Sequence, residues 1–134
     1  MVFRLSADGR DFALGSGASV VGFLFGLALL AVAATRRIDL LDRPVVVVAF
    51  VSVAFAFGVV GLYDNVALGV PRRGAAHLVS GAALVLALLA PYGRSSMLFV
   101  LTASLSLLAS ASYQLALVVG LFEADEQPAD ELES

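Results

Sequence analysis

The chain alternates between long apolar stretches and short polar connections. The apolar stretches cover about residues 17–34, 44–62, 74–90 and 97–122, and none contains Asp, Glu, Lys or Arg. A hydrocarbon core about 30 Å thick is crossed by about 20 apolar residues in helical conformation, which is close to the length of each stretch. The pattern therefore predicts an all-α protein, an antiparallel four-helix transmembrane bundle.

The polar connections are too short to fold as a soluble domain, so we predict one four-helix transmembrane domain over residues 1–122. Short connections also predict that successive helices pack as antiparallel neighbours. Residues 1–14 show no clear helical face and are expected to form an interfacial or extended lead-in. The first apolar stretch is longer than a signal-peptide core of about 7–15 residues, so we expect it to be retained. Residues 123–134 are acidic and predict a disordered, solvated tail.

Composition agrees with a membrane protein and narrows the chemistry. Hydrophobic residues make up 60% of the chain, charged residues 14%, and the mean hydropathy is +0.98. Cysteine is absent, which excludes a thiol nucleophile and a Cys-ligated metal. No paired carboxylates and no nucleophile with an adjacent base stand out. We expect no catalytic residue, cofactor or metal site, no enzymatic activity and no nucleic-acid partner.

The basic residues are all Arg, and acidic residues outnumber them, which gives a net charge of −3. Together with abundant Ala, Val and Gly, this bias resembles the composition of haloarchaeal proteins. Codon bias alone explains the missing Lys equally well.

Orientation in the membrane is weakly encoded, because the arginines divide equally between the two sides. One side of the predicted bundle holds Arg4, Arg10, Arg72 and Arg73, and the other holds Arg36, Arg37, Arg43 and Arg94. All acidic residues except Asp39 and Asp42 lie on the side of the termini. Counting these acids makes the terminal side net negative (4 − 9 = −5) and the other side net positive (4 − 2 = +2). Because cytoplasmic loops tend to be the more basic, we predict a multi-pass protein of the cell membrane with both termini outside.

A polar stripe occupies the fourth apolar stretch. Thr102, Ser106, Ser110 and Gln114 recur every four residues, so each step advances about 40° around a helix. We predict that this stripe does not face lipid. Ser and Thr commonly connect neighbouring helices, which is the preferred interpretation, and a hydrated path or ligand contact is the alternative.

His77 is the only histidine, and it lies one turn into the third helix with Ser80 one turn later. An ionisable residue at membrane depth is a candidate functional site. As a proton site it would need a partner such as Asp64 or Tyr63. A structural or interfacial role is the preferred interpretation.

Small residues mark faces where helices can approach closely. Gly22 and Gly26 form a GxxxG motif, and Gly81 lies on the third helix. These glycines suit packing within the bundle and docking of a partner equally well.

The order Asp64-Asn65 followed by His77-Leu78-Val79-Ser80-Gly81 resembles the arrangement in small uncharacterised four-helix membrane families that are broadly DoxX-like in size. Such families include accessory subunits of redox complexes, so the resemblance implies an architecture more than an activity. Our functional prediction is a non-enzymatic accessory or scaffold subunit that associates through small-residue faces in a homo-oligomer or larger membrane complex. The alternative is a small oligomeric transporter or channel that uses the polar stripe, with His77 as its proton site. A membrane enzyme or quinone-linked redox protein ranks last.

Overall fold

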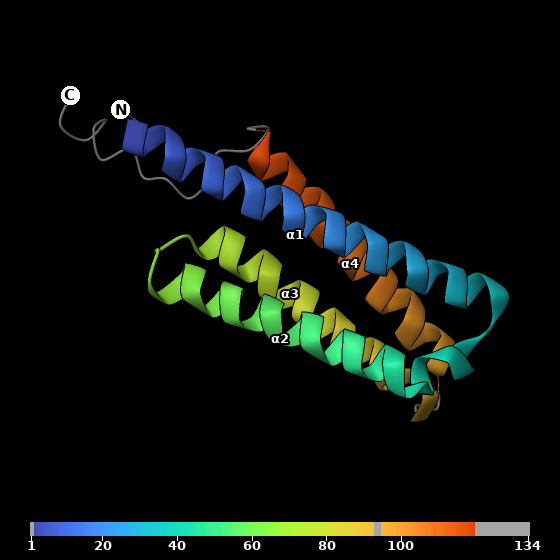
Figure 1. Ribbon diagram of the computed structural model, residues 1–134. Helices are drawn as coiled ribbons and strands as arrows, with labels where there is room; N and C mark the ends of the chain where they lie inside the picture. The colour runs from blue at the N-terminus through green and yellow to red at the C-terminus, as the bar shows by residue number, and fades with distance from the viewer. Residues whose placement is uncertain (1, 93–94, 120–134) are drawn as a thin grey trace.

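The computed structural model describes residues 2–92 and 95–119, with side chains from residue 16 onward. Its helices are α1 (Val2–Thr35), α2 (Pro44–Val66), α3 (Pro71–Leu88) and α4 (Ser96–Val118), with short 3-10 helices η1 (Ile38–Asp42) and η2 (Ala90–Tyr92). The four α-helices run up and down in turn, and no strand occurs among the described residues (Figure 1). The predicted antiparallel four-helix bundle is confirmed.

Each helix is long and apolar enough to cross a membrane. The spans are Ser16–Thr35, Pro44–Val66, Pro71–Tyr92 and Ser96–Val118, and many large apolar side chains on them point outward. In the most apolar part of the α3 span, 50% of the residues are buried inside the bundle. In the corresponding part of α2, only 17% are buried. The architecture is therefore that of a multi-pass membrane protein in which α3 is central and α2 is peripheral.

Packing follows the order α1, α4, α3, α2. Close backbone contacts join α1 to α4, α4 to α3 and α3 to α2. Among the described residues, no Cα atom of α1 lies within 8 Å of one in α2, and the rings of Phe25 and Phe50 bridge them at 5.0 Å. The prediction that successive helices pack as neighbours is wrong for this pair. The intervening η1, anchored by buried Leu41, separates the helices, while α1 packs against α4.

Several helix boundaries also differ from the prediction. Residues 2–14, expected to form an interfacial or extended lead-in, are helical, since α1 begins at Val2. No proline occurs in this segment to interrupt the helix. The last turn of α2 includes Asp64 and Asn65, which lie beyond the apolar stretch 44–62 that predicted this helix. Pro71 occupies the first turn of α3, a position that its fixed φ angle favours. The predicted end of the fourth helix near residue 122 and the acidic tail at residues 123–134 lie outside the described residues.

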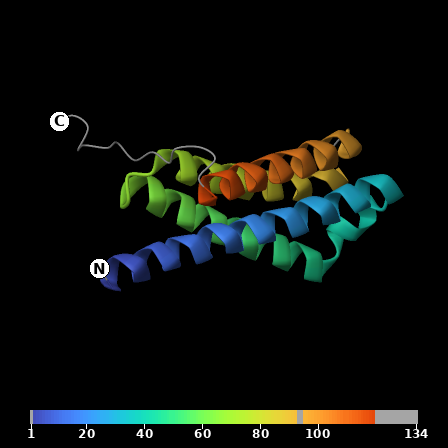
Figure 2. The same ribbon diagram turned by 90° about the horizontal axis from the view of Figure 1, so that it is seen from above.

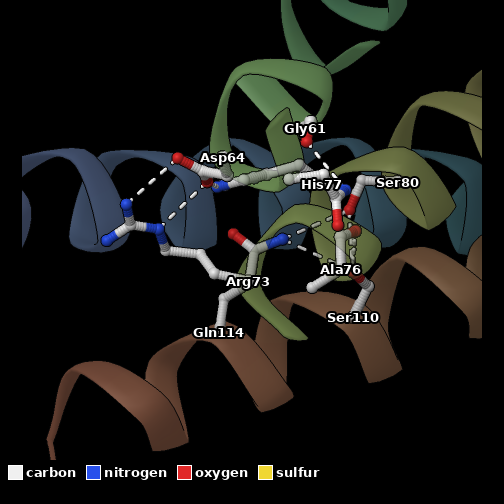
Figure 3. A network of polar contacts seen from close by, with 9 residues as sticks. Gly61, Asp64, Arg73, Ala76, His77, Ser80, Ser110 and Gln114 are labelled. Atoms are coloured by element: carbon white, nitrogen blue, oxygen red, sulfur yellow. Dashed lines mark hydrogen bonds and ion pairs between the residues drawn. The ribbon is translucent and has the colours of Figure 1, made fainter. Parts of the chain in front are cut away.

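Three features meet at one end of the bundle: the start of α1, the α2–α3 turn and the end of α4 (Figures 1 and 2). The η1 and η2 segments lie at the other end. The described apolar core extends along α1, α3 and α4 and includes fully buried Leu29, Leu84, Val100 and Leu107. Most of the buried polar residues, Asp64 and His77 among them, lie instead toward the α2–α3 turn, which makes that end the candidate site (Figure 3).

Candidate functional site

An acid–base cluster of Asp64, Arg73 and His77 lies beside the α2–α3 turn. Asp64 comes from the last turn of α2, whereas Arg73 and His77 are four residues apart near the start of α3, on one face of that helix. Arg73 donates two hydrogen bonds to the Asp64 carboxylate, Nε to Oδ2 and Nη2 to Oδ1, each 3.0 Å long (Figure 3). His77 Nε2 lies 3.4 Å from the same Oδ2 atom. One carboxylate therefore serves two basic side chains.

Two of the three side chains of the acid–base cluster are buried, and the third is partly exposed. The Asp64 and His77 side chains are each 4% exposed, and that of Arg73 is 25% exposed. His77 is about 9 Å along the helix from Pro71, at 1.5 Å per residue. Charges at such depth are tolerated only when they are paired, and the bidentate geometry provides that pairing. Such a cluster near the membrane boundary is a functional candidate.

Glycines bring the two helices together at this point. A Cβ atom on Gly61 would lie 2.9 Å from the carbonyl oxygen of Gly74, and one on Gly74 would lie 2.8 Å from that of Gly61. The Asn65 amide donates to the Gly61 carbonyl at 2.9 Å, and the backbone N–H of Val70 donates to Asp64 O at 2.9 Å. The turn thus holds the end of α2 against the start of α3, which places Asp64 opposite Arg73 and His77.

A serine cluster of Ser80, Ser110 and Gln114 connects α3 to α4 at the same end. Ser110 Oγ donates to the Ala76 carbonyl at 2.7 Å and lies 2.8 Å from Ser80 Oγ (Figure 3). Because the Ser110 proton is used on Ala76, Ser80 is the donor of the second bond. Gln114 Nε2 approaches Ser110 and Ser80 at 3.4 and 3.5 Å. Its Oε1 has no hydrogen-bond partner among the described residues.

The two clusters occupy different faces of α3. His77 faces Asp64 on α2, while Ser80 contacts Ser110 on α4. No hydrogen bond between described side chains joins one cluster to the other. The predicted set of candidate residues is therefore split between two helix interfaces.

The polar stripe of α4 is only half enclosed. Ser110 and Gln114 are buried, Ser106 is half-buried and Thr102 is exposed. Within the single chain nothing covers Thr102, so the expectation that the stripe avoids lipid stays a prediction at this position. Three steps of four residues turn the stripe through about 120°, which is enough to carry its far end out of the α3–α4 interface.

A groove opens where α1 and α2 stand apart. Its volume is about 390 Å³, and its walls include Ala18 and Val21 from α1, Val53, Phe57 and Val60 from α2, and His77 from α3. The His77 ring stacks on Phe57 with centroids 5.9 Å apart. His77 Nδ1 has no hydrogen-bond partner among the described residues. His77 is thus the one residue of the acid–base cluster that lines the mainly apolar α1–α2 groove, and its Nδ1 atom is buried and not open to the groove.

The glycines of the predicted packing faces lie within the bundle. A Cβ atom on Gly22 would be 2.9 Å from Ala111 Cβ, and one on Gly26 would be 2.8 Å from Leu108 Cδ2. Ser104 Oγ donates to the Gly26 carbonyl at 2.9 Å across the same α1–α4 contact. For Gly81 the nearest atom is the Ala54 carbonyl oxygen of α2, 3.1 Å away. These three positions are covered by the chain itself.

Arg73 is the functional candidate that the sequence analysis did not single out. Its signal was the spacing of four residues to His77, which places both on one helix face. No group of three His, Cys, Asp or Glu side chains that could hold a metal occurs in the part of the chain that the structure describes. The cluster is suited to orienting a histidine ring, since Asp64 faces one nitrogen and leaves the other free.

Comparisons with protein-family models, curated proteins and solved structures find no match to this chain. The resemblance to DoxX-like proteins therefore stays a prediction. The function has to be argued from the acid–base cluster and the α1–α2 groove.

Proposed function

We propose that this chain is a non-enzymatic accessory protein of the membrane that binds a small lipid-soluble molecule in the α1–α2 groove. One observation carries the proposal: the helix pair that stands apart leaves a mainly apolar groove between α1 and α2, with His77 among the residues that line it. Small-molecule sites commonly have volumes of about 300–1,000 Å³, mainly apolar walls and a few polar groups, and this groove fits that description.

The groove is placed to be filled from the bilayer. Outward-facing Val20 and Leu24 flank it on α1, and Val51 and Phe55 flank it on α2. A hydrophobic molecule would enter between these helices without crossing water. Tight glycine contacts close the α1–α4 and α2–α3 interfaces, so α1 and α2 form the natural entrance.

A binding role suits the chemistry better than a catalytic one. The two hydrogen bonds from Arg73 occupy both oxygen atoms of the Asp64 carboxylate, which leaves neither oxygen free for a substrate. His77 alone would then have to act as acid and base. The acid–base cluster holds the His77 ring in a fixed position, and a fixed side chain is what recognition of a ligand in the groove requires.

Co-purification tests the proposal directly. The protein would be extracted from native membranes under mild conditions, and its lipid-soluble content analysed by mass spectrometry. Gly17→Leu fills the groove, because Gly17 lines it and a Cβ atom there meets nothing within 4 Å. Gly58→Leu is the matched control, since Gly58 also has open space but does not line the groove.

We expect one compound to be enriched over bulk lipid in the wild type and the Gly58→Leu variant, and lost in Gly17→Leu. Equal content in all three proteins would contradict the binding role. Proteins that co-purify in the same preparation test the accessory role.

The proposal includes a location in the cell membrane with both termini outside. The support is the concentration of acidic residues on the terminal side of the sequence. A reporter fused after Ser134 should be active only outside the cytoplasm, and activity inside it would reverse the orientation.

An oligomeric transporter is the second candidate, favoured by Thr102. This residue is exposed on a membrane-spanning helix and makes no hydrogen bond to another described residue. A second copy packed over Thr102 and Ser106 would cover these hydroxyls. Thr102→Leu should then reduce the native mass to that of a monomer, and Ala at Ser106, Ser110 and Gln114 should abolish flux. Unchanged mass and flux would remove this candidate.

A further inference from the structure

Two arginines, Arg36 and Arg43, flank the η1 segment that connects α1 to α2. We infer that these flanking arginines bind the phosphate groups of acidic phospholipids, which makes the η1 end of the bundle a docking surface for anionic lipid head groups. This inference does not depend on the binding function proposed for the α1–α2 groove, because neither arginine lines the groove.

Both flanking arginines lie at the boundary of the membrane. The first candidate span ends at Thr35 and the second begins at Pro44, so Arg36 and Arg43 are the residues immediately outside the spans. Both are exposed. Arg at the end of a membrane-crossing helix extends its charged group into the head-group region, where a guanidinium binds phosphate through two parallel hydrogen bonds. The orientation proposed above places this end on the cytoplasmic side, where acidic lipids attract basic segments.

The acidic residues of η1 are already in use. Asp39 accepts hydrogen bonds from Arg37 Nε at 3.2 Å and Nη2 at 3.4 Å, and Asp42 accepts one from the Tyr92 hydroxyl. The side chains of the flanking arginines form no hydrogen bond or ion pair with another residue of the described chain. Residues 36–43 hold three arginines and two aspartates, so the unpaired charge of this surface is positive and attracts anions.

Arg36 holds a backbone conformation that glycine adopts at lower cost. Its φ angle is 55°, the only positive value at a described residue other than glycine. Its N–H donates to the Ala33 carbonyl at 3.3 Å, and the next N–H along the chain donates to the Val32 carbonyl at 3.1 Å. Glycine is usual in this type of helix end, because only the backbone is needed to form both bonds. Strain of this kind commonly marks a functional residue, and what Arg36 provides at that cost is a cation at head-group level.

The docking surface is held firmly against the bundle. Leu41 in the middle of η1 is 2% exposed, and Ile38 packs on the apolar core. The bond from the Tyr92 hydroxyl to Asp42 connects η1 to η2. A five-residue 3-10 helix is about 10 Å long at about 2 Å per residue, which spaces the flanking arginines for two phosphate groups.

Lipid binding to the full chain in a neutral detergent, measured by native mass spectrometry, tests the inference. The probes are dihexanoyl phosphatidylglycerol, which is anionic, and dihexanoyl phosphatidylcholine, which is zwitterionic. We expect the anionic lipid to bind more tightly, and Arg36→Gln and Arg43→Gln each to weaken its binding roughly fivefold, the typical contribution of one basic residue near a membrane surface. Arg36→Lys should retain more binding than Arg36→Gln.

A double variant, Arg37→Gln with Asp39→Asn, is the matched control. It removes the neighbouring ion pair without changing the net charge and should bind both lipids as the wild type does. Equal binding of the two lipids to the wild type, or full binding in both single Gln variants, would overturn the inference. Competition by inorganic phosphate would assign the arginines to a free anion and overturn the lipid assignment.

Arg36→Gly separates lipid binding from a role in the fold, since a cation also complements the dipole at the end of α1. Glycine relieves the strained φ angle, so the free energy of unfolding without lipid should equal or exceed that of the wild type. Binding of the anionic lipid should weaken as in Arg36→Gln. A loss of stability with unchanged lipid binding would show that Arg36 serves the fold and would overturn the inference. None of these outcomes bears on the groove, whose test is the lipid-soluble content of Gly17→Leu.

Discussion

The two ends of the bundle both carry Arg–Asp pairs, but in opposite environments. At the η1 end, Arg37 Nε lies 3.2 Å from Asp39 Oδ1, and the two side chains are 55% and 59% exposed. At the α2–α3 end, Arg73 binds Asp64 through two 3.0 Å hydrogen bonds, and the Asp64 side chain is 4% exposed. Similar chemistry therefore has different consequences at the two ends.

Chain separation and solvent explain the contrast. Arg37 and Asp39 are two residues apart, so their contact is local and both groups remain hydrated. Asp64 and Arg73 belong to different helices and pair only when α2 and α3 are packed. Burying charges costs hydration, which the exposed pair retains and the buried pair replaces with direct hydrogen bonds. Only the buried pair depends on the fold and orients a third group, His77.

Removing the buried acid should have the largest effect. Asp64→Ala leaves Arg73 without its bidentate partner in a buried setting, and losses of about 3–5 kcal/mol are typical of such changes. The free energy of unfolding in mixed detergent micelles measures the loss. Asp39→Ala at the exposed pair is the control, expected to match the wild type within error. Equal losses from both variants would mean that the two ends do not differ as described.

Separating α2 from α3 should have the next largest effect. In Gly61→Ala the new methyl group would lie 2.9 Å from the Gly74 carbonyl oxygen, a backbone atom that cannot move independently. Overpacking of this kind costs about 1–3 kcal/mol, and it would also lengthen the Asp64–Arg73 contact. The same unfolding assay applies. Gly58→Ala, which meets nothing within 4 Å, should leave stability nearly unchanged, and a similar loss there would point to a general effect of alanine.

A smaller effect is expected from the serine cluster, which lies at the same end but contains no charges. Ser110→Ala removes the bond to the Ala76 carbonyl and leaves Ser80 without its acceptor. Hydrogen bonds between membrane helices contribute on average about 0.6 kcal/mol and at most about 1.7 kcal/mol. Ser112→Ala is the control, because Ser112 is exposed and bonds to Leu108 of its own helix. A loss as large as that of Asp64→Ala would show that charge is not what distinguishes this end.

The helices were predictable from the sequence because membrane thickness sets their length. About 20 uninterrupted apolar residues are sufficient to identify a span, whatever it packs against. The order of packing was not predictable, since Gly22 and Gly26 offer a flat surface that fits many helices. The choice of α4 depends on the fit of Ala111 and Leu108, which lie more than 80 residues away in the chain.

The candidate site was only partly predictable. Asp64 was named as a possible partner of His77, and the structure places them 3.4 Å apart. Arg73 was missed because the second helix was predicted to end before Asp64, which hid the contact between the last turn of α2 and the start of α3. The α4 stripe was predicted as one surface, whereas its rotation of about 40° per step divides it between the interior of the bundle and its outer surface.

The exposed end should give the smallest effect, visible in titration and not in stability. The hydrogen bond from Arg37 holds the pKa of Asp39 below its ordinary value of 3.8. An acid whose pKa is lowered by folding stabilises the fold at higher pH, and this contribution is lost as pH falls through the lowered pKa. Arg37→Gln should raise the pKa of Asp39 toward 3.8 in a ¹³C-carboxyl NMR titration. Salt should reduce the difference between variant and wild type, because both groups are hydrated. Loss of folding in Arg37→Gln at neutral pH would place a structural ion pair at this end too and remove the contrast with Asp64.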